Sequence, residues 1–259
     1  MSRPEAVGSG PSARSGFRDL YARFVGAPAY PATDGDRRTV GILGLDLPVR
    51  ATIAIVVVTL VILFDYTRTF IPPHIQDLGR SAEGLRFQAI ERAILFGLVP
   101  ALVVLLVFRD RLVAYGLGLG DWRWGVGLAV LGCAVMTPVV VALGSGPDFG
   151  TYYRVGAAPL GDLLVTHLLE LVPAEFLLRG FLMFVLLRRI GPLGLVVAQV
   201  PFVFAHLGKP ELELFSTILG GAVFGWLNWR TRSIWWSALG HAYILTLVVV
   251  VAGATTPPA

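Results

Sequence analysis

Long apolar runs separated by short polar segments form the main pattern of the chain. A helix needs about 20 residues to cross the roughly 30 Å hydrocarbon core of a bilayer. The clearest run, residues 124–144, contains no charged side chain. Backbone polar groups in lipid must be satisfied within their own segment, so each run predicts a helix. The predicted spans are residues 47–66, 89–108, 124–144, 160–187, 192–207, 212–229 and 234–253.

This pattern predicts an all-α fold, a polytopic membrane helix bundle of about seven transmembrane helices in one domain, residues 47–259. The chain is 55% hydrophobic and 15% charged, whereas a soluble domain carries about 25% charged residues. Residues 1–46 are rich in Gly, Ala, Pro, Ser and Arg, and we expect a mostly disordered tail. Within this tail, the stretch GFRDLYARFV (16–25) fits either a short helix in the membrane interface or weakly structured chain.

The arginines predict how the bundle is oriented. They are concentrated in the N-terminal tail and in alternate connections, at 109–123, 188–189 and 230–232. Basic residues in short loops favour the cytoplasmic side, so we expect a cytoplasmic N-terminus and a C-terminus on the opposite side. Twenty arginines to one lysine, with abundant Ala, Gly and Val, indicate a high-GC bacterium. The expected location is therefore a bacterial inner or plasma membrane.

Several other features have structural explanations. The net charge is only +4, and no basic patch is interleaved with aromatic residues, which argues against nucleic-acid binding. The single cysteine, Cys133, excludes an intrachain disulfide. Gly221 and Gly225 form a Gly-x-x-x-Gly face, which predicts close helix packing.

Ionisable residues inside the apolar runs are the main functional signal. In the stretch PAEFLLRGF (173–181), Glu175 and Arg179 are four residues apart, the favoured spacing for a helical ion pair. Charges within a membrane normally face the bundle interior and pair with one another. His206 follows the fifth run, and His241 lies in the seventh. From a rise of 1.5 Å per residue, we expect Glu175 and the two histidines to converge within the bilayer.

Two imidazoles and a carboxylate can activate water in two ways. One is general-base catalysis by the side chains, and the other is zinc held by Glu175, His206 and His241. His167 and Glu170 share a helical face and are candidates for a proton path or a supporting role. Asp162 is expected to be solvated near the interface.

At these residues the chain resembles the CAAX-protease and bacteriocin-processing (CPBP, or Abi) family of intramembrane endopeptidases. The family motifs are Glu-Glu-x-x-x-Arg, Phe-x-x-x-His and His-x-x-x-Asn/Asp on successive helices. This sequence has AEFLLRG (174–180), FVFAH (202–206) and HAYIL (241–245). The resemblance covers residues 160–250 and implies hydrolysis of peptide bonds in membrane-associated substrates. It also implies that Glu175 activates water, Arg179 fixes Glu175 and His206 holds the water. His241 would polarise the scissile carbonyl or stabilise the oxyanion.

Two departures separate the chain from the family pattern. Ala174 replaces the first glutamate, which is the water activator in the family, and Leu245 replaces the final polar residue. Glu170 lies one turn before Ala174 and could present a carboxylate on that face. Asn228 is a candidate substitute for the missing polar group. Lys209 and Glu213, in the segment HLGKPELE, are candidates for a lid or a substrate contact.

Two alternatives to a peptidase remain open. The departures at Ala174 and Leu245 are compatible with a catalytically silent pseudoprotease that acts as a membrane scaffold or binding protein. A small transporter would use His167, Glu170 and Glu175 as a proton relay, but neither inverted repeats nor paired broken helices are evident. The sequence favours the peptidase because Glu175 and both histidines are retained.

Overall fold

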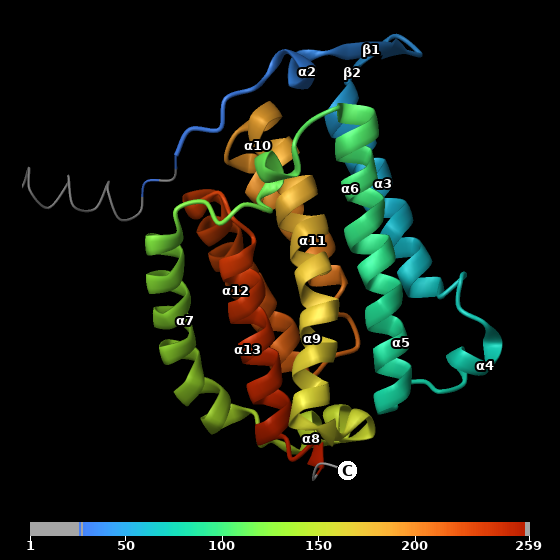
Figure 1. Cartoon of the computed structure of the whole chain (residues 1–259), viewed down its shortest axis with the longest axis vertical. Coiled ribbons are helices and arrows are strands. Elements are labelled where there is room, and N and C mark those ends of the chain that lie inside the picture. The colour runs from blue at the N-terminus through green and yellow to red at the C-terminus, as the bar shows by residue number, and fades with distance from the viewer. Residues whose placement is uncertain (1–25, 27, 257–259) are drawn as a thin grey trace, which may run out of the picture.

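The computed structural model describes residue 26 and residues 28–256. The stretch 16–25, which fits either an interfacial helix or weakly structured chain, lies outside these residues. The longer helices coincide with the seven predicted spans, and the all-α prediction is confirmed (Figure 1). They are α3 (Val49–Thr67), α5 (Ala82–Arg92), α7 (Trp122–Leu143), α9 (Leu160–Glu175), α10 (Phe184–Ile190), α11 (Leu193–Phe204), α12 (Glu211–Thr231) and α13 (Trp235–Val251).

Three stretches of π-helix complete two of these spans. The second span runs without interruption through Ala82–Phe108, and the fourth joins α9 and α10 through η5. The π-helical stretches are η1 (Ala93–Leu98), η2 (Val103–Phe108) and η5 (Phe176–Met183), with α6 (Val99–Leu102) between the first two. The second span begins seven residues earlier than predicted, because Ser81 caps its start by accepting a hydrogen bond from the Gly84 amide.

Short elements lie at the two ends of the bundle. Figure 1 shows α2 and a hairpin at one end, and α4, α8 and the C-terminal end at the other. The hairpin pairs β1 and β2 in antiparallel register, and β3 pairs with β4 in parallel. These elements are α2 (Asp34–Arg37), β1 (Thr39–Ile42), β2 (Leu45–Pro48), α4 (Pro73–Gln76), η3 (Leu112–Tyr115), α8 (Pro147–Tyr153), η4 (Arg154–Gly156), β3 (Ala158–Pro159) and β4 (Thr255–Thr256).

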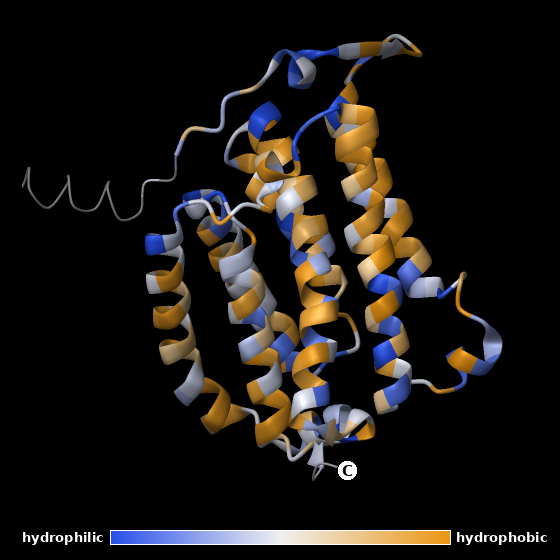
Figure 2. Ribbon diagram, in the orientation of Figure 1, coloured by the Kyte–Doolittle hydropathy of each residue, from blue (hydrophilic) through white to orange (hydrophobic). Residues whose placement is uncertain are grey.

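The outer helices expose apolar surface. Among the described residues, three helices are long and apolar enough to cross a membrane: Val49–Thr67, Ala82–Phe108 and Trp122–Leu143. Leu193–Phe204 and Trp235–Val251 are shorter apolar helices. Figure 2 shows hydrophobic residues over most of the bundle, with hydrophilic residues at its ends and at scattered positions within it. An exposed apolar surface of this extent is typical of contact with lipid.

The centre of the bundle is the continuous helix formed by η5 and α10. Every residue from Phe176 to Arg188 is buried, and this helix packs against α3, α9 and α11. A helix that is apolar around its whole circumference requires such a central position. Gly221 and Gly225 of α12 face the Gln199 and Leu195 side chains of α11, as the small-residue pattern predicts. The central helix therefore holds Arg179 away from both lipid and water.

Candidate active site

Glu175 is completely buried at the junction of α9 and η5, and three donors surround its carboxylate. Arg179 Nη1 donates to Oε1 at 2.8 Å, and Ser237 Oγ donates to Oε2 at 2.9 Å. His241 Nδ1 lies 3.0 Å from Oε1. Ser237 and His241 are one turn apart on α13, so a single face of that helix meets Glu175. The predicted ion pair is present, and α13 supplies the other two partners.

The contact with Glu175 determines which nitrogen of His241 carries the proton. A carboxylate accepts hydrogen bonds, so Nδ1 must carry the hydrogen and Nε2 is left with a lone pair. The His241 side chain is 13% exposed, whereas the Glu175 side chain is 0% exposed. His241 is therefore the group of this pair that can reach a water molecule or a substrate.

His206 has the same tautomer for a different reason. Its Nδ1 lies 2.8 Å from the Phe202 carbonyl oxygen, which only accepts hydrogen bonds. The rings of His206 and His241 are nearly parallel, with centroids 6.2 Å apart. α11 and α13 thus bring the two predicted histidines together, each with an Nε2 lone pair.

Arg179 is held by aromatic rings as well as by Glu175. Its guanidinium carbon lies 3.8 Å from the centroid of the Phe202 ring and 6.0 Å from that of Phe224. A desolvated guanidinium is stabilised on an aromatic face by the ring quadrupole. Phe202 is the first residue of the Phe-x-x-x-His motif, so this motif both supports Arg179 and anchors His206. Arg179 therefore positions Glu175 and is itself held in place.

Ser237 was not singled out in the sequence. Serine is common in helices, and nothing in its local pattern distinguishes it. Its position four residues before His241 is the signal that could have identified it, because residues at that spacing share a helix face.

The polar cluster consists of Glu175, Arg179, His206, Ser237 and His241. The two departures from the family pattern lie next to it. Ala174 is partly buried and packs against the apolar core. Leu245 packs in a second apolar cluster, formed by α13, α7 and α8. Asn228 is completely buried, and neither its Oδ1 nor its Nδ2 has a hydrogen-bond partner among the described residues. Asn228 therefore does not reproduce the missing polar contact to His241.

Glu170 and His167 belong to separate hydrogen-bond networks. Glu170 pairs with Arg92 of α5, which also binds Asp65 in a bidentate manner at 2.7 and 2.8 Å. His167 Nδ1 lies 2.8 Å from Thr246 Oγ1. Arg92 neutralises Glu170, so this carboxylate is not free to replace the one absent at Ala174. Asp162, at the start of α9, is half exposed and pairs with Arg86.

Lys209 and Glu213 form a polar contact where α11 connects to α12. Lys209 Nζ donates to Glu213 Oε1 at 2.7 Å, and Tyr153 OH donates to Oε2 at 2.6 Å. Burial disfavours the charged form of Lys209, but its interactions with Tyr153 and Glu213 outweigh this effect and raise the pKa of its ammonium. Lys209 therefore remains charged at neutral pH.

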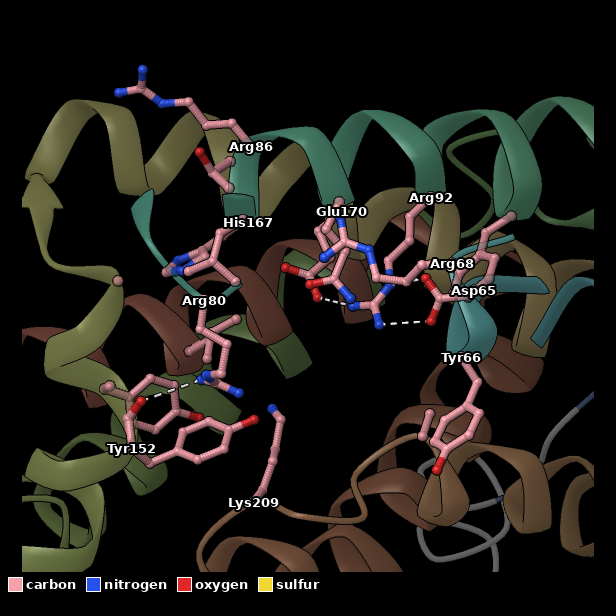
Figure 3. A pocket seen from close by; sticks show the side chains of 18 of the residues that line it. Asp65, Tyr66, Arg68, Arg80, Arg86, Arg92, Tyr152, His167, Glu170 and Lys209 are labelled. Carbon is pink, nitrogen blue, oxygen red and sulfur yellow. Dashed lines mark hydrogen bonds and ion pairs between the residues drawn. The ribbon is translucent and has the colours of Figure 1, made fainter. Parts of the chain in front are cut away.

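A cavity of about 660 Å³ lies beside the polar cluster (Figure 3). Residues of α3, α5, α8 and α9 line it, together with the connection between α11 and α12. Glu170, His167 and Lys209 line it, whereas Glu175, His206 and His241 do not. Ala205 and Leu207, on either side of His206, and Leu245, one turn after His241, are also in its wall. The cavity thus borders the polar cluster at both histidines.

The donor set of Glu175, His206 and His241 does not fit a zinc ion as it is folded. Both Glu175 oxygens accept hydrogen bonds, and His241 Nδ1 donates to one of them. Zinc ligands need free lone pairs that converge on one point. Over residues 28–256, no group of three or more His, Cys, Asp or Glu side chains is placed to hold a metal ion.

The family model described as Type II CAAX prenyl endopeptidase Rce1-like matches residues 156–247. The resemblance is confirmed over this segment. No curated protein and no solved structure matches the chain. The Rce1-like segment contains α9, η5, α10, α11 and α12 and most of α13, and therefore every residue of the polar cluster. Together with the apolar helices, the match identifies an integral membrane protein.

Proposed function

We propose that this chain is an intramembrane endopeptidase that hydrolyses peptide bonds in membrane-associated peptides or proteins. The Rce1-like match supports peptidase chemistry in general. The observation that carries the proposal is the 3.0 Å contact between His241 Nδ1 and Glu175 Oε1, made between separate helices inside the bundle. A buried carboxylate that orients an imidazole is the arrangement by which many hydrolases prepare a general base.

In the proposed mechanism His241, and not Glu175, accepts the proton of the attacking water. Glu175 has three donors and no exposed surface, so its role is to hold the Nδ1–H and to stabilise the imidazolium that forms. The water oxygen bonds to the scissile carbonyl carbon while its proton moves to His241 Nε2. His241 then returns this proton to the leaving amine as the C–N bond breaks.

His206 is assigned to holding the water. Its Nε2 carries a lone pair, because Nδ1 is committed to the Phe202 carbonyl. This lone pair can accept the second O–H of the water and orient the oxygen towards the carbonyl carbon. Arg179 keeps Glu175 ionised and in place through the 2.8 Å contact.

A catalytically silent binding protein is the second candidate, and specific residues favour it. Ala174 supplies no carboxylate, Leu245 supplies no polar group beside His241, and the buried Glu175 has three hydrogen-bond donors. The same contacts between α9, α11 and α13 would also stabilise the bundle in a protein that catalyses no reaction. The two candidates differ in whether the purified chain turns over substrate.

Hydrolysis of a library of membrane-anchored, fluorogenic peptides by the full chain in detergent tests the proposal. We expect His241→Ala to lower turnover at least about 100-fold, which is the lower end for removal of a general base. Glu175→Gln should lower it as well, because an amide cannot stabilise the imidazolium. His74→Ala is the matched control, since His74 is exposed on α4.

Three outcomes distinguish the alternatives. Full turnover in His241→Ala would contradict the mechanism. Absence of turnover in the well-folded native chain would establish the silent binding protein. A chelator should leave turnover unchanged if the side chains act alone, and loss of turnover on chelation would assign the water to a metal ion.

A further inference from the structure

The cavity beside the polar cluster has a cationic part and an apolar part. Arg80 lies between α4 and α5, and Lys209 lies between α11 and α12. Figure 3 shows their side chains directed into the same hollow, next to Tyr152. Other parts of the wall are apolar and come from Leu63, Phe96, Leu163 and Val249 among others. This division suits a ligand that has a charged head and a hydrocarbon chain.

Among the described arginines and lysines that line the cavity, Arg80 is the exception to a pattern of ion pairs with carboxylates. Both lining carboxylates, Asp65 and Glu170, bind Arg92. Arg80 has no carboxylate within ion-pair distance in the described part of the chain. Its guanidinium instead lies 3.4 Å from the Tyr152 ring centroid, and Nη2 donates to the Tyr152 carbonyl at 3.3 Å. Arg80 is therefore a preformed cationic donor without an anion.

Arg68, on the opposite wall, has a carboxylate partner only at a long distance. Its nearest carboxylate, that of Glu91, is 4.0 Å away. Its Nε and Nη2 are buried and have no hydrogen-bond partner within the part of the chain that the structure describes. Guanidinium groups with unused donors are well suited to the oxygen atoms of a phosphate, with which they form strong charge-assisted hydrogen bonds.

The cavity also reaches the lipid-facing surface. Leu63 and Tyr66 of α3 line it and are 50% and 84% exposed. Phe204 and Leu207 line it from the other side and are each 62% exposed. In a bilayer these apolar side chains face acyl chains, so a chain bound in the cavity can continue into the membrane. The volume of about 660 Å³ lies within the range of small-molecule sites.

We propose that this cavity binds a phosphate-bearing amphiphile, a membrane phospholipid, with its phosphate between Arg80 and Lys209 and its hydrocarbon along Leu63 and Phe96. Lys209 remains bound to Glu213 and uses its other N–H donors for the phosphate. The site is distinct from Glu175, His206 and His241. This inference does not depend on peptidase activity, because a silent binding protein would have the same cavity.

Native mass spectrometry of the full chain in neutral detergent tests the site. Dioleoyl phosphatidylglycerol is compared with dioleoylglycerol, which has the same chains but no phosphate, and with inorganic phosphate, which has no chain. A hexapeptide with a free carboxylate is the fourth probe. We expect the phospholipid to bind at least about tenfold more tightly than dioleoylglycerol, which lacks the charge-assisted hydrogen bonds. It should exceed inorganic phosphate and the peptide by a similar factor, because neither has the acyl chains that bury apolar surface.

Substitutions locate the binding. Arg80→Gln and Lys209→Gln should each weaken phospholipid binding about tenfold, while Arg189→Gln, an exposed arginine outside the cavity, should leave it unchanged. Thermal unfolding of each variant shows whether it is folded, and Lys209→Gln provides the test if Arg80→Gln is not. Equal binding of dioleoylglycerol or of inorganic phosphate would overturn the proposal. Preference for the peptide, or unchanged binding in the folded variants, would do so too.

Discussion

Glu175 shows how one buried charge is stabilised in a membrane bundle. An unpaired charge in hydrocarbon costs several kcal/mol, and here the carboxylate has a guanidinium, an imidazole and a hydroxyl as donors. Arg179 balances its charge, while Ser237 occupies the oxygen that the other two donors leave free. Oε1 has two donors and Oε2 has one, so removal of the Ser237 hydroxyl leaves a buried carboxylate oxygen without a partner. At the scale of single residues, the cluster is therefore sensitive to loss of Ser237.

Ser237→Ala should lower the free energy of unfolding by about 1–3 kcal/mol, because Glu175 Oε2 loses its donor in a buried site. Thermal or denaturant unfolding in a fixed detergent measures this change. Ser216→Ala is the matched control, since Ser216 is exposed on α12 and bonds only a backbone carbonyl. Equal stability of the two variants would show that Oε2 does not depend on this hydroxyl.

At the scale of elements, η5 carries both Arg179, which binds Glu175, and a glycine that allows close packing. Its glycine, Gly180, directly follows Arg179 and faces the Tyr115 carbonyl of η3. A Cβ atom there would lie 2.6 Å from that carbonyl oxygen and 2.7 Å from the Phe176 ring. The absence of a side chain lets the 112–115 turn reach the central helix. The position of η3 thus depends on a residue next to the polar cluster.

Gly180→Ala should destabilise the protein, even though alanine is the better helix former by about 1 kcal/mol. The backbone carbonyl of Tyr115 cannot move aside as a flexible side chain can. Gly220→Ala on α12 is the comparison, because no atom lies within 4 Å of its added Cβ, and it should preserve or raise stability. The unfolding temperatures of the two variants measure whether Gly180→Ala is the less stable protein. A Gly180→Ala protein as stable as Gly220→Ala would mean that η3 is not held against η5.

Sequence periodicity predicted the helical elements well and their internal geometry poorly. Runs of apolar residues determine where a helix lies in a membrane, so six of the seven spans begin within three residues of their predicted starts. The π-helical turns of η1, η2 and η5 depend on packing between helices, which no local pattern records. In the same way, Glu175, Arg179, His206 and His241 could be selected as ionisable residues in apolar runs. The proposal that His241 reacts while Glu175 and Arg179 position it rests on the side-chain geometry, which no local pattern records.

At the scale of the whole molecule, the two ends of the bundle differ in composition. One end carries α2, the hairpin and the arginine-rich connections, and the other carries α4, α8 and the C-terminal end (Figure 1). Residues 28–36 lie across the first of these ends, where Trp229 Nε1 donates to the Pro28 carbonyl and Tyr30 stacks on Phe184. The direction in which the bundle faces the cell remains a prediction from the arginine distribution.

Cysteine labelling in intact cells measures this direction. In a Cys133→Ala background, Thr256→Cys should react with a membrane-impermeant maleimide added outside. Arg111→Cys should react only after the cells are permeabilised. Both positions are exposed and lie at opposite ends of the bundle. The reverse labelling pattern would place the arginine-rich end outside.

The ion pair between Glu175 and Arg179 also affects how the chain can be made. Arg179 is synthesised four residues after Glu175, whereas His241 is synthesised 66 residues after it. At about 5–20 residues per second, this interval lasts roughly 3–13 s. During that time the fourth helix must be inserted without its partners from the seventh. Because Arg179 balances the Glu175 charge within the same helix, this helix can be inserted before α13 is made. The ion pair that holds Glu175 in the folded protein thus also allows the bundle to assemble.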